Sequence, residues 1–496
     1  MPLCIANGYY SARAYLHSFH SIRRHMRMAK SPNLKFFKTA LRKHRTSPKL
    51  LSAKHDYIVL PIISALVGGM TGLIIALFEA AVLWTDAQRL QIFNPLALPP
   101  SLNILLIMIL SGAMVGFSFW LTLRFAPEAS GSGITHIEGA LDGMYDIRWR
   151  RLLPVKLIAG TLAIGSGMIF GRAGPSIQIG GTIGRMFADT AKRYTNATHI
   201  LVAAGAAAGL AAAFNAPLAG ILFVIEEMRP HFRYNMTSIK CVTLAAAVAT
   251  IVMRAFHGQE AVMPIMHFDV PPLTSLWLFL LLGSIFGVIG VYFNRWIINS
   301  TKLLKRKQNN KMHRIILTGV FFGSLFALLQ SFVPDMAGNG RDLMVRMIQE
   351  PSTWAILVGL FVIRLFGTIA CFASGAPGGV FTPMLTLGTL FGLAYGVIAA
   401  ELFPSFVAEP TVYAIAGMGA LFAATVRAPV TGIVLVVEMT DSYELILPLL
   451  ITCLGATFVA QALGGKPLYA ELLKLSLPKE PAAEDNAITA TRSPTS

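Results

Sequence analysis

Residues 171–181 read GRAGPSIQIGG, a glycine-rich stretch that directly follows an apolar segment at residues 152–170. Backbone that leaves the helical conformation at membrane depth must be buried in protein or line a watery cavity, because lipid offers its polar groups no partners. Small residues allow close approach of a ligand, and the free N–H groups of a following helix carry the positive end of its dipole. The stretch therefore predicts either an anion site or a simple kink in a spanning helix.

The composition around this stretch is that of a membrane protein. Of the 496 residues, 55% are hydrophobic and 13% are charged, and the mean hydropathy is +0.62. A soluble chain of this length normally has about a quarter of its residues charged. We therefore predict an all-α, multi-pass integral membrane protein.

Apolar segments of two lengths recur along the chain. Several reach the roughly 20 residues that span a bilayer, and others are too short to cross it alone. Short segments interrupted by glycine or proline, at matching places in two halves, are typical of a transporter's binding site. The segments lie at residues 57–84, 102–125, 152–170, 200–225, 242–253, 276–293, 315–332, 354–372, 384–403, 413–426, 430–439 and 445–462.

Two parts of the chain match each other without gaps. Residues 205–226 read GAAAGLAAAFNAPLAGILFVIE, and residues 417–438 read GMGALFAATVRAPVTGIVLVVE. Chance matches between Ala/Gly-rich helices explain two ungapped blocks poorly, so we predict an internal duplication. Matching residues are Ala216-Pro217 with Ala428-Pro429, Gly220 with Gly432, Glu226 with Glu438, and, for the opening stretch, Gly171 with Gly379, Pro175 with Pro383 and Gly180 with Gly388.

Basic residues mark the cytoplasmic side. Residues 1–56 contain twelve Lys or Arg and one acid, and further basic clusters occupy residues 148–151, 229–240 and 302–314. Such flanks stay in the cytoplasm, so we expect both termini on the cytoplasmic side of the membrane and two repeats of opposite orientation. The expected parts are a basic cytoplasmic segment (1–56), a first membrane repeat (57–256), an extracytoplasmic linker (257–274), a second membrane repeat (275–476) and a polar tail (477–496).

The net charge of +17 lies at these membrane flanks, which favours anionic lipid as a partner and excludes nucleic acid. The first thirty residues have the composition of a transit peptide, although Met26 or Met28 is an alternative start. No apolar stretch precedes residue 57, so no cleavable signal is predicted. The cysteines have no metal-ligand spacing, so we predict packing thiols, no metal and no cofactor at Cys4, Cys241, Cys371 and Cys453.

Three glycine-rich breaks precede apolar helical stretches: residues 131–135 (GSGIT), 171–175 (GRAGP) and 379–383 (GVFTP). Each can direct a helix N-terminus at a common point. Partial charges and bare amides bind a small anion weakly enough to release it, as conduction requires, whereas a ring of arginines would hold it.

Together these segments resemble the CLC family of chloride channels and H⁺/Cl⁻ exchange transporters, in particular its compact bacterial exchangers. The family's filter motifs GSGIP, GREGP and GxFxP read GSGIT, GRAGP and GVFTP here, and the resemblance covers about residues 57–475. It implies two inverted-topology repeats of spanning and half-spanning tilted helices, and a homodimer with one pore per subunit. The implied filter consists of Gly131, Ser132, Gly133, Ile134, Thr135, Gly171, Arg172, Ala173, Gly174, Pro175, Gly379, Val380, Phe381, Thr382 and Pro383.

The resemblance also implies roles for single residues. The hydroxyls of Ser132 and Tyr469 would bind chloride, together with the backbone amides of Val380 and Phe381. A helix N-cap at Ser132 and an interfacial tyrosine at Tyr469 are the alternatives. Glu227 falls on the family's internal proton-transfer glutamate.

Glu226, beside it, is a second candidate for the proton route or a structural residue. Buried charges in membranes are costly and usually paired. We therefore expect structural ion pairs at Glu138, Lys156, Arg364 and Arg427.

Ala173 departs from the family pattern, because the exchangers carry an external gating glutamate at this position. A methyl group cannot accept a proton, so we predict chloride transport uncoupled from protons. The alternative is an H⁺/Cl⁻ antiporter in which the proton enters through Glu227. Another carboxylate then replaces the missing one, or the alanine is an introduced change from glutamate.

Two other classes of membrane protein fit the sequence less well. A membrane-embedded enzyme would need a nucleophile with a base or a metal-binding pair of histidines, and the eleven histidines show no such spacing. A cation carrier would need a ring of acids in the filter, and the motifs contain none. We therefore predict a transporter or channel and no enzymatic activity.

Overall fold

The computed structural model describes residues 53–92, 99–191, 197–228, 235–259, 262–263, 271–309, 311–407 and 409–476. Most of the predicted basic segment 1–56, half of the linker 257–274 and the whole tail 477–496 lie outside these residues. Within them the secondary structure is helical, apart from one isolated antiparallel bridge between Gly171 and Gly379. The predicted all-α fold is confirmed.

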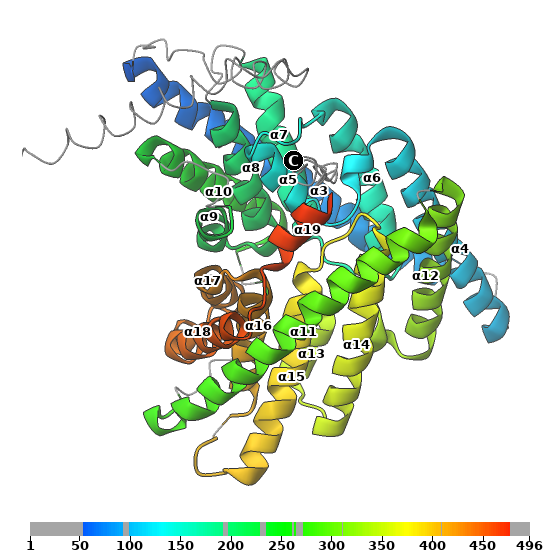
Figure 1. Cartoon of the computed structure of the whole chain (residues 1–496), viewed down its shortest axis with the longest axis vertical. Helices are drawn as coiled ribbons and strands as arrows, with labels where there is room; N and C mark the ends of the chain where they lie inside the picture. Colours follow the sequence, from blue (N-terminus) through cyan, green and yellow to red (C-terminus); the bar gives the residue numbers. More distant parts are fainter. Residues whose placement is uncertain are drawn as a thin grey trace, which may run out of the picture. The chain divides into compact units, whose positions relative to one another are not determined.

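The described helices form two series in matching order (Figure 1). The first series is α3 (Ala53–Gln91), α4 (Pro100–Phe125), α5 (Ile134–Leu141), α6 (Trp149–Gly165), α7 (Ala173–Thr190), α8 (Ala197–Phe214), α9 (Pro217–Glu226) and α10 (Met236–His257). The second is α11 (Leu276–Gln308), α12 (Met312–Phe332), α13 (Arg341–Gln349), α14 (Trp354–Ser374), α15 (Phe381–Leu402), α16 (Thr411–Val426), α17 (Pro429–Thr440) and α18 (Ile446–Ala462), followed by α19 (Leu468–Ser476). Helix α7 packs on α8 as α15 packs on α16, and α8 packs on α10 as α16 packs on α18.

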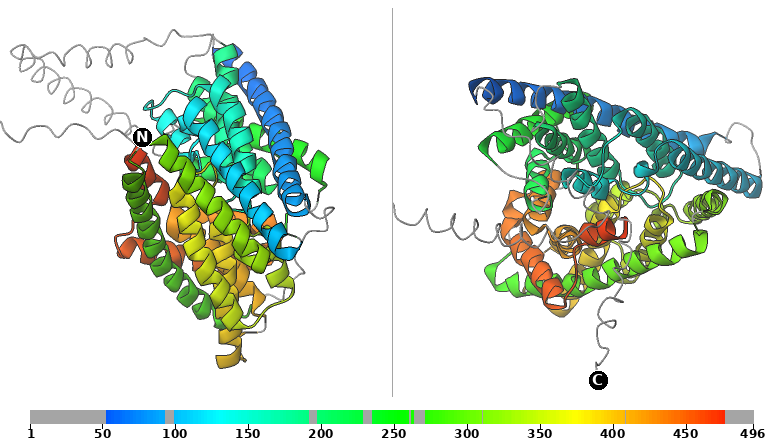
Figure 2. Two further views of the ribbon diagram at one scale, coloured as in Figure 1. Left: turned by 90° about the vertical axis from the view of Figure 1, so that its right-hand side faces the viewer. Right: turned by 45° about the horizontal axis from the view of Figure 1, so that its top comes forward.

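Eight of the described helices are long and apolar enough to cross a membrane. Helices α3 and α11 are the longest, with 39 and 33 residues, and both views of Figure 2 place them on opposite sides of the helical body. Helix α11 extends beyond the apolar segment predicted at residues 276–293, because it continues to Gln308 through a basic last turn. The protein is a multi-pass integral membrane protein.

The apolar segment predicted at residues 200–225 is wrong as a single element. The chain breaks at Asn215, which has a left-handed φ of 53°, and at Ala216, whose φ of −125° is not helical. A residue before proline is disfavoured in a helix, and proline suits the first position of the next one. Arg427 (φ 73°) and Ala428 (φ −117°) repeat this break between α16 and α17, so the duplication extends to single backbone conformations.

Paired glycines bring neighbouring helices into backbone contact. A Cβ atom on Gly180 would lie 2.0 Å from the carbonyl oxygen of Gly205, and one on Gly388 would lie 2.3 Å from that of Gly417. Both pairs tolerate no larger residue. Small residues at helix crossings are typical of membrane proteins, where tight van der Waals packing replaces the hydrophobic effect.

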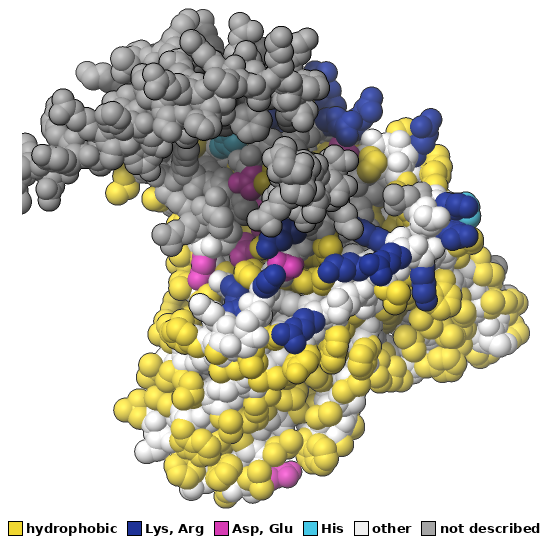
Figure 3. Space-filling model, in the orientation of Figure 1, with side chains coloured by type: hydrophobic (Ala, Val, Ile, Leu, Met, Phe, Trp, Pro, Cys, Tyr) yellow, Lys and Arg dark blue, Asp and Glu magenta, His cyan; other side chains and the backbone are white. Residues whose placement is uncertain are grey.

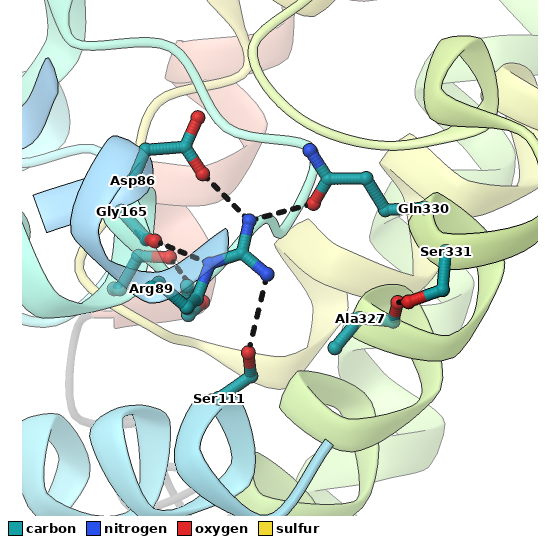
Figure 4. Close-up of polar contacts among 9 residues, drawn as sticks. Asp86, Arg89, Ser111, Gly165, Ala327, Gln330 and Ser331 are labelled. Atoms are coloured by element: carbon teal, nitrogen blue, oxygen red, sulfur yellow. Dashed lines mark hydrogen bonds and ion pairs between the residues drawn. The ribbon is translucent and has the colours of Figure 1, made fainter. Parts of the chain in front are cut away.

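A buried arginine joins the two helical series (Figure 4). The Arg89 side chain is 1% exposed, and its Nη2 atom contacts Asp86 Oδ1 at 2.6 Å. Its Nε donates to the Gly165 carbonyl (3.0 Å), Nη1 donates to Ser111 Oγ (3.4 Å) and Nη2 donates to Gln330 Oε1 (2.7 Å). Helices α3, α4 and α12 and the end of α6 therefore meet at one guanidinium.

Figure 3 shows one face of the molecule, on which the visible lysines and arginines gather at one end and hydrophobic side chains dominate the other. Large apolar side chains such as Leu77, Phe321 and Phe458 are 59%, 61% and 68% exposed. Such a surface is stable when its apolar part faces lipid and its basic end lies at the headgroups.

Candidate functional site

The three glycine-rich motifs meet in the structure. Gly171 and Gly379 exchange two backbone hydrogen bonds, of 2.8 and 2.9 Å. A Cβ atom on Gly174 would lie 2.9 Å from Ser132 Cβ and 3.2 Å from Gly379 Cα. Helices α5, α7 and α15 begin within these motifs, at Ile134, Ala173 and Phe381, so three helix N-termini start beside one cluster of backbone atoms.

The loop that carries Ser132 is held by a buried lysine. Lys156 Nζ donates to the carbonyl oxygens of Ala129 (2.9 Å) and Gly131 (2.7 Å). Gly133 has a φ of 85°, which glycine adopts without strain. Ser132 Oγ accepts a hydrogen bond from the Ile134 backbone N–H at 3.3 Å, but Gly133 and not Ser132 is the N-cap residue of α5. The hydroxyl hydrogen stays available to another acceptor, which is compatible with an anion-binding role.

Phe381, the first residue of α15, is fully buried. Its ring centroid lies 4.5 Å from that of Phe422, 5.2 Å from that of Phe214 and 6.3 Å from that of Phe223. Rings from both repeats thus fix the start of α15, and the apolar cluster excludes water from the neighbouring amides.

Tyr469 is fully buried, and its hydroxyl has no hydrogen-bond partner among the described residues. Helix α19, which carries it, packs against α5. Two side chains hold the preceding segment: Arg427 Nη2 donates to the Gly465 carbonyl (3.0 Å) and Asn294 Nδ2 to the Lys466 carbonyl (3.0 Å). A buried hydroxyl without a partner is destabilising unless it has an acceptor to donate to, which suits an anion-binding role.

The expected ion pairs at three cations are replaced by contacts with backbone carbonyls. Within the described part of the chain, Lys156 donates to the loop before Ser132, and Arg427 donates to Thr457 and Gly465, both at 3.0 Å. Arg364 donates to the backbone carbonyls of Asp335 (2.6 Å), Ala337 (3.0 Å) and Gly338 (2.7 Å). Carbonyls at glycine-rich turns have no helical partner, so they attract buried donors.

Two acids and a tyrosine form a second cluster. Glu227 is partly buried at the end of α9, and Glu138 is close enough to interact with it electrostatically. Both interact with Tyr469 in the same way. Neither carboxylate oxygen of Glu138 has a hydrogen-bond partner within the described chain, so the expected ion pair at this residue is wrong. Lys156 donates to the loop before Ser132, and among the described residues no cation pairs with Glu138.

Glu226 and Glu438 cap each other's helices. The Glu226 carboxylate accepts hydrogen bonds from the backbone of Thr431 (2.7 Å) and Val430 (3.2 Å), in the first turn of α17. Glu438 accepts one from the backbone of Ala219 (2.8 Å), in the first turn of α9. The two helices are therefore antiparallel, and both oxygens of Glu226 have partners, which favours its structural role.

Ala173 is completely buried at the start of α7. The residue before it, Arg172, forms an ion pair with Glu79 of α3 and donates to the Ala213 carbonyl at 3.3 Å. Glu79 was not predicted to be a site residue from the sequence. An acid in the middle of an apolar segment was the available signal.

The family profile described as voltage gated chloride channel matches residues 112–461. The chain belongs to this family. Its relatives include the H(+)/Cl(-) exchange transporters ClcA of Vibrio campbellii, 51% identical over 418 residues (84% of this chain and 89% of that protein), and of Salmonella arizonae, 46% identical over 445 residues (90% and 94%).

Solved structures of the family have the same fold. A slow cyanobacterial Cl⁻/H⁺ antiporter matches with a TM-score of 0.80 and 43% identity, covering 84% of this chain and 97% of that chain. A eukaryotic CLC transporter matches with a TM-score of 0.72 and 25% identity, covering 84% and 74%. The structure of a CLC-type fluoride/proton antiporter, 20% identical with a TM-score of 0.70, shares the fold.

Proposed function

We propose that this chain transports chloride across a membrane. The observation that carries the proposal is the meeting of three helix N-termini at Ser132, Gly174 and Gly379, in a family named for chloride channels. Bare amides and hydroxyls bind an anion without a full counter-charge, so the ion can be released. Chloride ligands in this proposal are the hydroxyls of Ser132 and Tyr469 and the backbone N–H groups around Val380 and Phe381.

Exchange of chloride for protons is the form of transport that the relatives favour, since the ClcA proteins and the cyanobacterial protein are named as proton-coupled. The acid cluster supports proton loading from one side, with Glu227 as the inner proton-transfer residue and Glu138 beside it. Exchange then needs an outer proton acceptor other than residue 173.

Uncoupled chloride transport is the second candidate, and Ala173 is the observation that favours it. The methyl group can neither carry a proton nor compete with chloride as a carboxylate does. The inner acids would in that case exchange protons with the cytoplasm without passing them on.

One experiment separates these activities. Purified protein in liposomes is given a chloride gradient, and chloride and proton movements are followed together. Chloride flux with uphill proton movement supports exchange, chloride flux alone supports uncoupled transport, and absence of chloride flux refutes the proposed function. A reversal potential that follows the potassium or sodium gradient would also contradict the proposal that the transported ion is an anion.

We also propose that the protein is a homodimer with one pore per subunit in a bacterial inner membrane. Both termini lie in the cytoplasm, and anionic lipid contacts the basic flanks. Cross-linking in native membranes tests the dimer, and labelling of single cysteines introduced at exposed positions such as Lys474 tests the orientation.

A further inference from the structure

A polar cavity of about 240 Å³ lies beside the second filter motif. Its walls include Glu79 of α3, Arg172 before α7, Asn215, His257 at the end of α10 and Arg341 at the start of α13. In the orientation proposed above this is the outer side, since α10 ends at the predicted extracytoplasmic linker. The cavity is separate from the Ser132–Tyr469 site.

The lining of the cavity contains two guanidinium groups and one carboxylate, and the Asp342 carboxylate, outside the lining, also interacts electrostatically with Arg172. Arg172 and Arg341 both contact one oxygen of Glu79, Oε1, the second at 3.5 Å. The other oxygen, Oε2, is buried and has no hydrogen-bond partner among the described residues. Two guanidinium groups thus face one carboxylate. The Arg341 side chain is 35% exposed and the Glu79 side chain 2%, so the cation is accessible while the acid is not.

A second, much smaller cavity of about 30 Å³ lies between these arginines and the third motif. It shares Arg172, Arg341 and Val262 with the first, and its walls also include Thr382 of the third motif and Phe214. A cation in the wall of an open cavity raises the local concentration of anions, because walls of low dielectric focus its field. The two arginines therefore raise the local concentration of anions beside the third motif.

We propose that this cavity is a second anion site, which binds a small inorganic anion such as chloride between Arg172 and Arg341. Glu79 is its built-in counter-ion: the carboxylate satisfies the arginines, and an arriving chloride competes with it for their N–H donors. This inference rests on the proposed chloride transport, to which it adds an anion-binding site on the outer side. Arg341 sets the affinity, because it is the more exposed of the two cations and has a second hydrogen bond, to the Val262 carbonyl at 2.9 Å, that holds it in place.

The test replaces the charge at position 341 and then restores it chemically. Arg341→Cys protein in liposomes should need roughly threefold more chloride for half-maximal flux, the scale expected for loss of one partly exposed charge, with little change in maximal flux. A membrane-impermeant, positively charged thiol reagent added outside should restore the wild-type value. A negatively charged reagent of the same size should raise it further.

Arg346→Cys is the matched control. Arg346 lies on the same helix, is 56% exposed and pairs with Asp335 away from the cavity, so neither reagent should change its chloride dependence. Glu79→Gln should have the opposite effect, because removal of the competing carboxylate should lower the chloride concentration needed for half-maximal flux. The inference is overturned if Arg341→Cys matches the wild type, or if both reagents act alike. Failure of the wild type itself to move chloride refutes the proposed function instead.

Discussion

The carboxylates of Glu226 and Glu438 occupy equivalent places in the two repeats, and each accepts backbone hydrogen bonds from the first turn of the helix that carries the other. Because each carboxylate lies in the last turn of its own helix, the two helices must be antiparallel. The pair α9–α17 is therefore the point at which the inversion of the repeats is visible in single hydrogen bonds, and Figure 1 shows the two helices side by side.

Removal of this cap should affect stability and leave transport coupling unchanged. Glu226→Ala leaves two backbone N–H donors in the first turn of α17 without their acceptor, which costs about 1–2 kcal/mol. Glu438→Ala should cost a similar amount, since its place is equivalent. Denaturant or thermal unfolding in detergent measures both. Loss of proton movement in Glu226→Gln without a change in stability would place this residue on a proton route and contradict its structural role.

Tyr469→Phe should weaken chloride binding without destabilising the fold. The hydroxyl is buried and has no partner among the described residues, so its removal takes away an unsatisfied group and is neutral or stabilising. Calorimetric titration with chloride should show a loss of affinity of about tenfold, the value of one hydrogen bond to a charged group. Unchanged affinity would assign the tyrosine to packing alone.

Lys156→Met should misplace Ser132. The two loop carbonyls that the ammonium now satisfies would remain buried without donors, at a cost of about 1–3 kcal/mol each. We expect a lower unfolding temperature together with weaker chloride binding. Lys156→Arg, which keeps the charge and donors, should retain part of both. A stable Lys156→Met protein with wild-type affinity would show that the loop needs no such anchor.

Ala173→Glu decides how position 173 relates to coupling. A carboxylate at the start of α7 would be able to accept a proton and to occupy the anion path. If the wild type is uncoupled, proton movement should appear in the variant and chloride flux should fall as external pH rises above the range in which glutamate titrates. If the wild type already couples chloride to proton movement, the substitution should change the transport rate more than the ratio of chloride to protons transported. Ala173→Gln, which has the same size without the titration, is the control.

Arg89→Met should be among the most destabilising single changes. The guanidinium joins α3, α4 and α12, and its loss leaves Gln330 and the Gly165 carbonyl without their donor. Removal of one member of a buried charged network typically costs about 3–5 kcal/mol. Unfolding monitored by tryptophan fluorescence provides the measurement, with Arg124→Met, outside this network, as the comparison.

The sequence predicted the features that depend on local chemistry. Glycine-rich motifs marked the starts of α5, α7 and α15, and the match between residues 205–226 and 417–438 identified the repeats. The break at Asn215 was missed, because apolar sequence on both sides hid the effect of Pro217. The partners of Lys156, Glu138 and Glu79 were missed because they depend on which loops meet in space. Apolar neighbours show that such a charge is buried, but they do not identify its partner.

The bridge between Gly171 and Gly379 joins the repeats across their seam, beside the proposed ion path. Many transporters built from inverted repeats work by rocking one repeat against the other about a fixed site. Here such a motion would break two short backbone hydrogen bonds in a dry interior and leave four polar groups unpaired, at a cost of several kcal/mol. The bridge therefore favours a transport cycle in which side chains and the outer ends of helices move while the two halves stay joined at their centre.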